Sequence, residues 1–210
     1  MKESKKEALT KFHRGNIIDA SQKLFLVKGI ENISMDDIAK EAGYSKATLY
    51  VYFKNKDEII SCMTLHAMKM LLVQVKACIG KKKDFKSQFF SVCYATYDFQ
   101  KEHLFYYKSI FTEINVDLEL EQTPKIYHEI YEVGEAINKE ILSMFKGGVA
   151  EGAIRSDIKL PQAAFTLWGS IFGVIHISKE KNKYFEKCFN LSEQEFLQYS
   201  FELLYQSIKM

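Results

Sequence analysis

The chain has 210 residues and a mass of 24.4 kDa, and its 47% apolar and 27% charged residues are typical of a folded globular protein rather than a disordered, collagen-like or low-complexity chain. Ten glycines and two prolines are about half the usual share, which favours long helices joined by few tight turns. The 29 Lys and Arg against 27 Asp and Glu leave a net charge of +2, which excludes a strongly basic, histone-like protein and does not by itself indicate nucleic-acid binding.

The cysteines and the first residues favour a cytoplasmic location. Residues 1–14 are charged and lack an apolar core, so no signal peptide is expected. The longest uncharged stretch, 163–178, is shorter than the roughly 18 apolar residues that a membrane span needs, so no membrane partner is expected. The cysteines are far apart and form no CxxC pair, which favours reduced thiols over a disulfide framework or a zinc site: Cys62, Cys78, Cys93 and Cys188.

Four helix starts or stops fall within the first 60 residues. Residues 1–14 hold five basic against two acidic side chains and are expected to form a frayed basic arm. Helical periodicity follows, with Ile17, Ala20, Leu24 and Phe25 on one face, and Gly29 ends this first helix. The remaining signals are the N-caps Ser34 (paired with Asp37), Ser45 and Asn55, and the turn residue Gly43.

The segment 34–53 therefore predicts a helix, a glycine-containing turn and a second helix, which is a helix-turn-helix. In that motif the second helix enters the major groove of DNA. Lys46 can reach a guanine edge or a phosphate, Tyr50 and Tyr52 can donate hydroxyls to phosphates, and Lys56 begins the next helix as a phosphate clamp. The expected DNA-binding residues are Ser34, Ser45, Lys46, Ala47, Thr48, Tyr50, Tyr52 and Lys56.

Composition alone leaves a purely structural helix-turn-helix open. The first 60 residues carry 11 basic against 9 acidic side chains, so the basic arm must supply much of the attraction to DNA. The run from 17 to 60, however, resembles the DNA-binding domain of the tetracycline-repressor (TetR) family. It departs from the family pattern at Ala47, Tyr44 and Ser21. The matching positions are Ile17, Ala20, Leu24, Phe25, Gly29, Ile38, Ala39, Ala42, Gly43, Ser45, Thr48, Leu49, Tyr50, Tyr52, Phe53, Lys56 and Ile59.

This resemblance implies an all-α bacterial transcription regulator, usually a repressor, that works as a homodimer. It implies a three-helix helix-turn-helix domain, placed at 1–55, and a larger helical domain, placed at 56–210, that binds a small effector and dimerises through its last two long helices. The patterning of the second region predicts helices at 56–79, 85–101, 103–116, 124–147, 161–179 and 192–208, with Gly147, Gly148 and Gly152 breaking the chain before Pro161.

Ten aromatic residues lie between 85 and 111, and they either fill a helical core or line a ligand cavity. Tyrosine suits a cavity because it offers an apolar ring and a polar tip. The candidate effector-binding residues are Met63, His66, Met70, Tyr94, Tyr97, Phe111, Tyr127, Tyr131 and Trp168. No histidine pair has metal-ligand spacing, so neither a metal site nor a cofactor is expected.

The uncharged stretch 163–178 predicts a helix with few exposed faces, either in a dimer interface or in the core of one chain. Its small residues permit close helix contact, and two such helices per subunit would form a bundle. The expected interface residues are Gly169, Phe172, Gly173, Phe196, Tyr199 and Leu203.

The residues of the chain favour one of three possible functions. An enzyme is not expected, because the chain has no nucleophile–base arrangement and no phosphate-binding glycine loop. A DNA-binding repressor released from a palindromic operator by a small hydrophobic effector fits the residues best. The alternative is a ligand-independent architectural or cell-division factor of the same fold, which would have neither cavity nor inducer.

Overall fold

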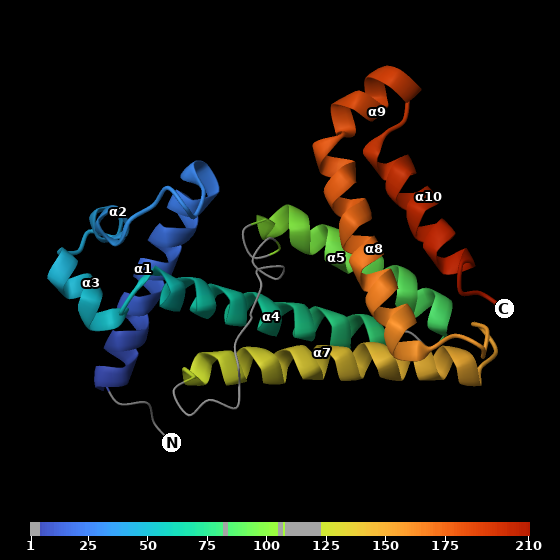
Figure 1. Cartoon of the computed structure of the whole chain (residues 1–210), viewed down its shortest axis with the longest axis horizontal. Helices are drawn as coiled ribbons and strands as arrows, with labels where there is room; N and C mark the ends of the chain where they lie inside the picture. Colours follow the sequence, from blue (N-terminus) through green and yellow to red (C-terminus); the bar gives the residue numbers. More distant parts are fainter. Residues whose placement is uncertain (1–4, 82–83, 105–106, 108–122) are drawn as a thin grey trace. The chain divides into compact units, whose positions relative to one another are not determined.

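The computed structural model describes residues 5–81, 84–104, 107 and 123–210, and these residues are helical apart from turns and one isolated bridge between Ile154 and Lys209 (Figure 1). The all-α prediction is confirmed. The helices are α1 (Lys5–Lys28), α2 (Met35–Glu41), α3 (Lys46–Tyr52), α4 (Lys56–Lys81), α5 (Phe85–Glu102), α7 (Lys125–Ala150), α8 (Leu160–Glu180), α9 (Asn182–Phe189) and α10 (Glu193–Gln206).

The described helices differ from the predicted ones in the basic arm and at α9. The expected basic arm is helical from Lys5, because residues 5–14 contain no glycine or proline and favour helix. Helix α9 was not predicted, since it is short and no side chain caps its first turn. The helix expected at 103–116 falls mostly outside the described residues.

The glycine-rich end of α7 also differs from the prediction of a break. Helix α7 continues through Gly147 and Gly148, and the left-handed residue that follows it is Gly152, with φ +71°. A Cβ on Gly148 would lie 2.6 Å from Cδ2 of Phe85. Gly148 therefore permits the close approach of α5 rather than ending α7.

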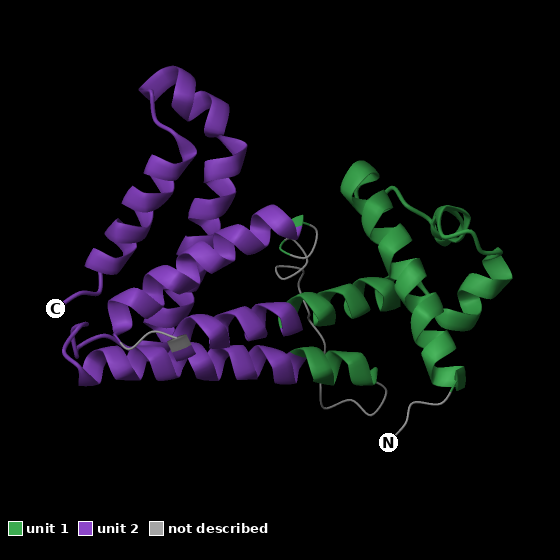
Figure 2. Ribbon diagram, turned by 180° about the vertical axis from the view of Figure 1, so that it is seen from behind, with its two compact units in different colours: residues 1–68, 104–130 green, residues 69–103, 131–210 purple. Residues whose placement is uncertain are grey.

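Packing divides the chain into two compact units, coloured separately in Figure 2. One unit holds the described residues within 1–68 and 104–130, and the other holds those within 69–103 and 131–210. Helices α4 and α7 each run from one unit into the other. The expected domain boundary at 55/56 separates a DNA-binding region from an effector-binding region by function and not by packing. It remains a prediction.

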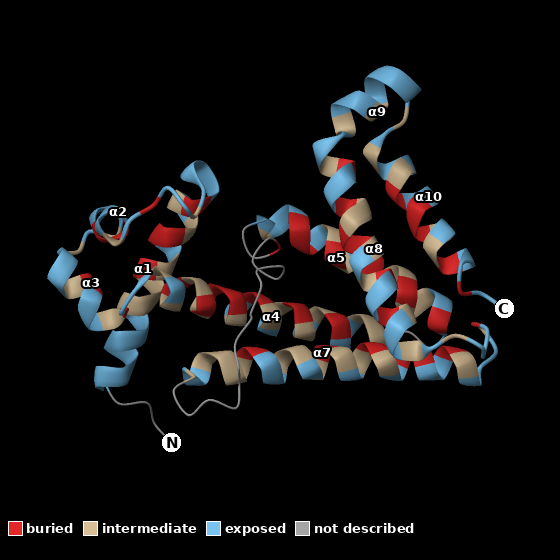
Figure 3. Cartoon of the chain, viewed as in Figure 1, coloured by how far each residue is buried: buried red, intermediate tan, exposed pale blue. Residues whose placement is uncertain are grey.

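The second unit is built on an aromatic core. The ring of Phe85 lies 5.3 Å from that of Phe145 and 6.3 Å from that of Tyr205, and Phe89 lies 5.8 Å from Tyr205. Helices α8 and α10 pack side by side, and both contact α5. The expected aromatic density of α5 thus fills a core at these positions, while the exposed sides of α8, α9 and α10 remain visible in Figure 3.

Two of the described helices, α4 over 56–80 and α8, are long and apolar enough to span a membrane by length and composition alone. Each has a window of mean hydropathy 1.3, of which 28% is buried. Core helices of globular proteins pass the same test of length and composition. Helix α4 begins shortly after α3, the second of two seven-residue helices.

Candidate DNA-binding surface

Helix α3 is held by two buried side chains, one within the helix and one at the residue that caps its C-terminus. Leu49 is fully buried and Phe53 is 1% exposed, and α3 packs against α1 and α2. Because both residues face inward, the opposite face of α3 is open to solvent. That face presents one cation, one small residue and two larger side chains: Lys46, Ala47, Tyr50 and Val51.

The turn between α2 and α3 has the predicted chemistry. Gly43 adopts a left-handed φ of +75°, and the N–H of Tyr44 donates to the carbonyl of Ala39 at 2.9 Å. The Ser45 hydroxyl then accepts from the N–H of Thr48 at 3.1 Å and caps α3. A capping glycine before a capping serine therefore fixes where the exposed face of α3 begins.

The other predicted caps are confirmed. Ser34 and Asp37 form a reciprocal capping box, in which the Ser34 N–H donates to the Asp37 carboxylate at 2.9 Å. The hydroxyl of Ser34 donates to the same carboxylate, and these hydrogen bonds hold the pKa of Asp37 below its ordinary value. Asn55 accepts from the N–H of Glu58 at 2.9 Å. The Ser34 hydroxyl is therefore already hydrogen-bonded as a cap. Because Ser34 is exposed to solvent, a DNA contact at this position stays a prediction.

Lys46 begins α3 and is paired within the protein. Its ammonium lies 2.8 Å from Oδ1 and 3.0 Å from Oδ2 of Asp36 in α2. Both side chains are well exposed, at 61% and 59%. This hydrogen bond and the charge of Asp36 work against a small desolvation effect and raise the pKa of Lys46.

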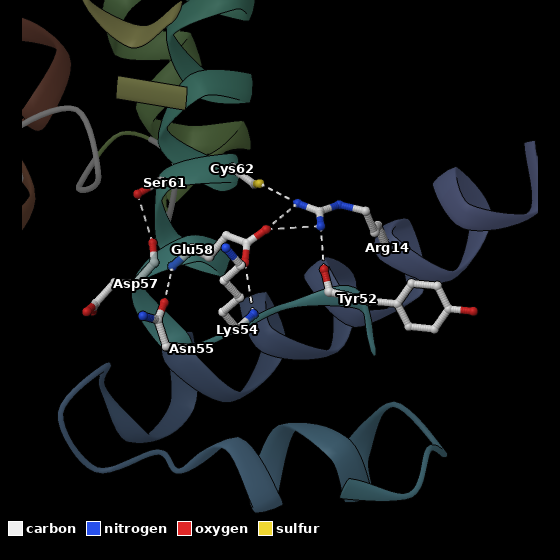
Figure 4. Close-up of polar contacts among 8 residues, drawn as sticks. All are labelled: Arg14, Tyr52, Lys54, Asn55, Asp57, Glu58, Ser61 and Cys62. Atoms are coloured by element: carbon white, nitrogen blue, oxygen red, sulfur yellow. Dashed lines mark hydrogen bonds and ion pairs between the residues drawn. The ribbon is translucent and has the colours of Figure 1, made fainter. Parts of the chain in front are cut away.

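Arg14 joins α1 to the start of α4, as Figure 4 shows. Its guanidinium donates to Oε1 of Glu58 through Nη1 and Nη2, both at 3.1 Å, and also to the carbonyl of Tyr52. The same group lies 3.9 Å from the centre of the Phe53 ring and 3.1 Å from the sulfur of Cys62. The end of α3 is therefore fixed relative to α4 through one side chain of α1.

Arg14 was expected in a frayed basic arm, and its role between α1 and α4 was not predicted. A signal was available, since Arg14 is one of only two arginines in the chain and the first unit otherwise uses lysine. Arginine is preferred where one cation must bind a carboxylate, a carbonyl and a ring together.

A second cluster joins the turn to α1. A hydrogen bond of 2.6 Å links Nδ1 of His13 to the Tyr44 hydroxyl, and Asn16 also donates to this hydroxyl at 3.4 Å. The His13 ring lies 5.2 Å from the ring of Tyr52. Tyr44, which departs from the family pattern, is thus tied into the domain and supports both the turn and the end of α3.

Lys56 makes contacts within the protein that the sequence did not predict. Its ammonium donates to the carbonyls of Ile30 at 2.8 Å and Ile33 at 3.0 Å, in the connection between α1 and α2. The side chain is half-buried, since its long stem carries the charge back into the domain. In this structure Lys56 therefore stabilises this connection, and its expected role as a phosphate clamp stays a prediction.

The family described as "Bacterial regulatory proteins, tetR family" matches residues 17–61, which include α2, α3 and the start of α4. Residues 17–61 belong to the tetR family. The first unit thus contains the DNA-binding domain of a TetR-family transcription regulator, and the prediction of a non-enzymatic, DNA-binding protein is confirmed.

The relatives of this TetR-family protein extend beyond that domain. The HTH-type transcriptional regulator SrpR of Pseudomonas putida is 20% identical over 163 residues, covering 78% of this chain and 73% of SrpR. The uncharacterized HTH-type transcriptional regulator YhgD of Bacillus subtilis is 27% identical over 66% of this chain and 70% of YhgD. The fold is shared by the regulator FadR of Bacillus subtilis, solved in complex with stearoyl-CoA, at a TM-score of 0.69 and 21% identity over 92% of this chain and 98% of that chain.

The candidate effector residues are distributed over both units. Met63, His66 and Tyr127 belong to the first, Met70, Tyr131 and Trp168 to the second, and Phe111 lies outside the described residues. Met63 is fully buried, whereas His66 and Tyr131 are exposed.

Tyr94 and Tyr97 of α5 are candidate effector-binding residues, and in this structure they contact side chains of α8 and α10. The Tyr94 ring meets Phe201 of α10 edge-on at 5.4 Å and borders an open groove of about 540 Å³ between α5 and α10. The Tyr97 ring lies 5.0 Å from the Lys179 ammonium, which pairs with Glu193 at 2.8 Å. In this structure both tyrosines contribute to joining α5 with α8 and α10, because they stand on the side of α5 that meets these helices.

The expected interface residues fall into two groups. Gly169, Tyr199 and Leu203 are exposed, Tyr199 and Leu203 at 70% and 58%, and Gly173 is half-buried. Phe172, by contrast, is 3% exposed in the core, and the Phe196 ring is 4.8 Å from that of Phe185 in α9. Packing within one chain already buries Phe172 in the core, whereas Phe196 is half-buried and stays a predicted interface residue.

Proposed function

We propose that this TetR-family regulator is a cytoplasmic repressor that binds a palindromic operator as a homodimer and is released by a small hydrophobic effector. The observation that carries the proposal is the exposed face of α3, which begins at a capped N-terminus and presents Lys46, Ala47 and Tyr50. Short side chains let the helix approach base edges closely, and a lysine can bond the guanine acceptors. Tyr50 is placed to donate to a phosphate.

A selection experiment tests this assignment. The wild-type protein would enrich duplexes from a random library, and the enriched palindrome would be titrated by fluorescence anisotropy. We expect Lys46→Ala and Tyr50→Phe to weaken operator binding, each by about tenfold, because they remove a base or phosphate contact. Val73→Ala, at an exposed position on α4, is the control. Unchanged affinity in both variants would refute the assignment of α3 as the reading helix.

The homodimer is supported by unpartnered apolar stripes on the last two long helices. Phe165, Gly169, Gly173 and Ile177 follow one another at four-residue spacing on α8, and Phe165 and Ile177 are 55% and 45% exposed. An uncharged helix with an exposed apolar stripe is stabilised by a second surface that covers it. Two-fold symmetry would also place two α3 helices on two half-sites.

Sedimentation tests the dimer. Leu203→Glu on α10 should shift the protein toward monomer at micromolar concentration, because it buries an unpaired charge in the interface. Val73→Glu places the same charge on an exposed part of α4 and should leave the mass unchanged. A wild-type monomer would refute the homodimer, whereas the DNA-binding domain would keep its assignment.

The proposed hydrophobic effector is supported by the ten aromatic residues between 85 and 111 and by the fold that this chain shares with FadR, which was solved with stearoyl-CoA. We therefore place long-chain acyl-CoA thioesters first in a panel that also holds free fatty acids and lipophilic organic cations. Fluorescence of Trp168, the single tryptophan, reports binding while anisotropy reports operator release. Typical allosteric coupling predicts a loss of operator affinity of about 5- to 150-fold. Binding without operator release would favour the ligand-independent alternative.

A further inference from the structure

We propose that Asp36 sets the sequence selectivity of this regulator by holding Lys46 away from the phosphates of non-operator DNA. The inference rests on the proposed function, since it takes Lys46 to be a DNA contact. Asp36 would touch no base in this role. It would act by holding the side chain that does.

The contact itself is specific. Asp36 stands in the first turn of α2, and both of its oxygens lie within 3.0 Å of the Lys46 ammonium. The neighbouring Asp37 closes the capping box with Ser34, so Asp36 is not needed for the cap. A carboxylate free of the capping role is thus directed at the first residue of the reading helix.

The exposure of the pair makes it exchangeable. With 61% and 59% of the two side chains exposed, neither charge is buried, and the ammonium can leave for another anion at a small desolvation cost. A phosphate that takes Lys46 from Asp36 replaces one anion by another. It also leaves Asp36 unpaired in the negative field of DNA, so the net gain from this phosphate contact is small.

A contact from Lys46 to a base differs from a phosphate contact in the charge of the acceptor. Guanine O6 and N7 are uncharged acceptors, and an ammonium has three N–H donors. Lys46 can therefore bond a guanine edge while it still donates to Asp36, whereas a phosphate that shared the ammonium would bring a second negative charge beside Asp36. Asp36 thus weakens binding through phosphates more than binding at the operator, and the difference increases selectivity.

A double-mutant cycle separates this mechanism from simple repulsion between Asp36 and DNA. Wild type, Asp36→Asn, Lys46→Ala and the double variant would be titrated against a mixed-sequence duplex and the selected palindrome over a range of KCl concentrations. Asp19→Asn, which removes an exposed carboxylate from α1, is the matched control. Thermal melts show that each variant is folded.

We expect Asp36→Asn to tighten binding to the mixed-sequence duplex by about two- to fivefold and to tighten operator binding less. The salt dependence on that duplex should steepen by about 0.9 in logarithmic slope, as for one more neutralised phosphate. Both effects should vanish when Lys46 is alanine.

Three outcomes would overturn the inference. An equal gain in the Lys46 and Lys46→Ala backgrounds means that Asp36 acts by repulsion alone. No gain from Asp36→Asn, with operator binding still weakened by Lys46→Ala, removes the inference and leaves the proposed function intact. If Lys46→Ala changes nothing on either duplex, the assignment of Lys46 to DNA and this inference both fail.

Discussion

The ammonium of Lys56 at the start of α4 donates to the carbonyl of Ile30 at 2.8 Å, across 26 positions of the chain. The same ammonium reaches Ile33 at 3.0 Å, so one lysine closes the connection between α1 and α2. This connection precedes the cap of α2. When this connection is held in place, the whole helix-turn-helix that follows it is held in place as well.

Lys56→Met keeps the apolar stem and removes the charge, and it should lower the free energy of unfolding by about 1–2 kcal/mol because two half-buried carbonyls lose their donor. Lys54→Met, at an exposed neighbouring position, should be close to neutral. Urea denaturation measures both. If Lys56→Met weakens DNA binding without affecting stability, the phosphate-clamp role was the correct one.

Arg14→Lys should destabilise the first unit nearly as much as Arg14→Ala, by about 1–3 kcal/mol. A lysine keeps the charge but cannot hold Glu58, the Tyr52 carbonyl and the Phe53 ring at once. Lys11→Ala, on an exposed part of α1, should have little effect. Denaturation followed by circular dichroism gives the values, and full rescue by lysine would contradict the proposed role of the planar group.

The two adjacent glycines of α7 should respond in opposite directions. Gly148→Ala places a Cβ within 3 Å of the packed Phe85 ring and should cost about 1–3 kcal/mol. Gly147 lies in the same helix, and a Cβ at this position would have no atom within 4 Å. Gly147→Ala should therefore stabilise the protein by about 0.5–1 kcal/mol. Thermal or urea unfolding of the two variants measures this, and equal effects would be inconsistent with the close approach of α5.

The capping boxes should make stability depend on acid pH. Hydrogen bonds from Ser34 lower the pKa of Asp37, and those from Ser192 lower the pKa of Glu195. A carboxyl with a lowered folded-state pKa stabilises the protein above its unfolded pKa of about 4, and this stabilisation is lost as the pH falls through the folded value.

Ser34→Ala should therefore lower the melting temperature by about 2–4 °C at neutral pH and by less near pH 2. Melting curves at several pH values measure the difference. Ser207→Ala, whose exposed hydroxyl bonds only a backbone carbonyl, should show the same small effect at every pH. A constant difference for Ser34→Ala would argue against the reciprocal bond to Asp37.

The four thiols should differ in reactivity toward iodoacetamide at neutral pH. Cys188 is exposed and should react first, whereas burial strongly raises the pKa of the fully buried Cys93. Burial also raises the pKa of Cys62, against the lowering effect of Arg14. Intact-mass measurements should show one adduct forming more than about tenfold faster than the others, and Cys188→Ser should abolish it.

The sequence by itself determined the secondary structure around the helix-turn-helix. Its signals are local: a serine hydroxyl caps the helix that directly follows it, and Gly43 adopts a left-handed conformation that other residues avoid. The long helices of the second region were also predictable from their periodicity. Helix α9 was not, because eight residues with no side-chain cap carry too little of either signal.

The tertiary structure alone decided what the long polar side chains do. From the sequence, three side chains are simply cations near a DNA-binding helix. The structure pairs Lys56 with backbone carbonyls, Arg14 with Glu58 and Lys46 with Asp36. It likewise showed that Gly148 accommodates Phe85, 63 positions away, and that Phe172 is a core residue. These partners lie 10 or more positions apart, and a flexible side chain several bonds long can reach any of several neighbours. Only the packing of the helices selects which neighbour it reaches.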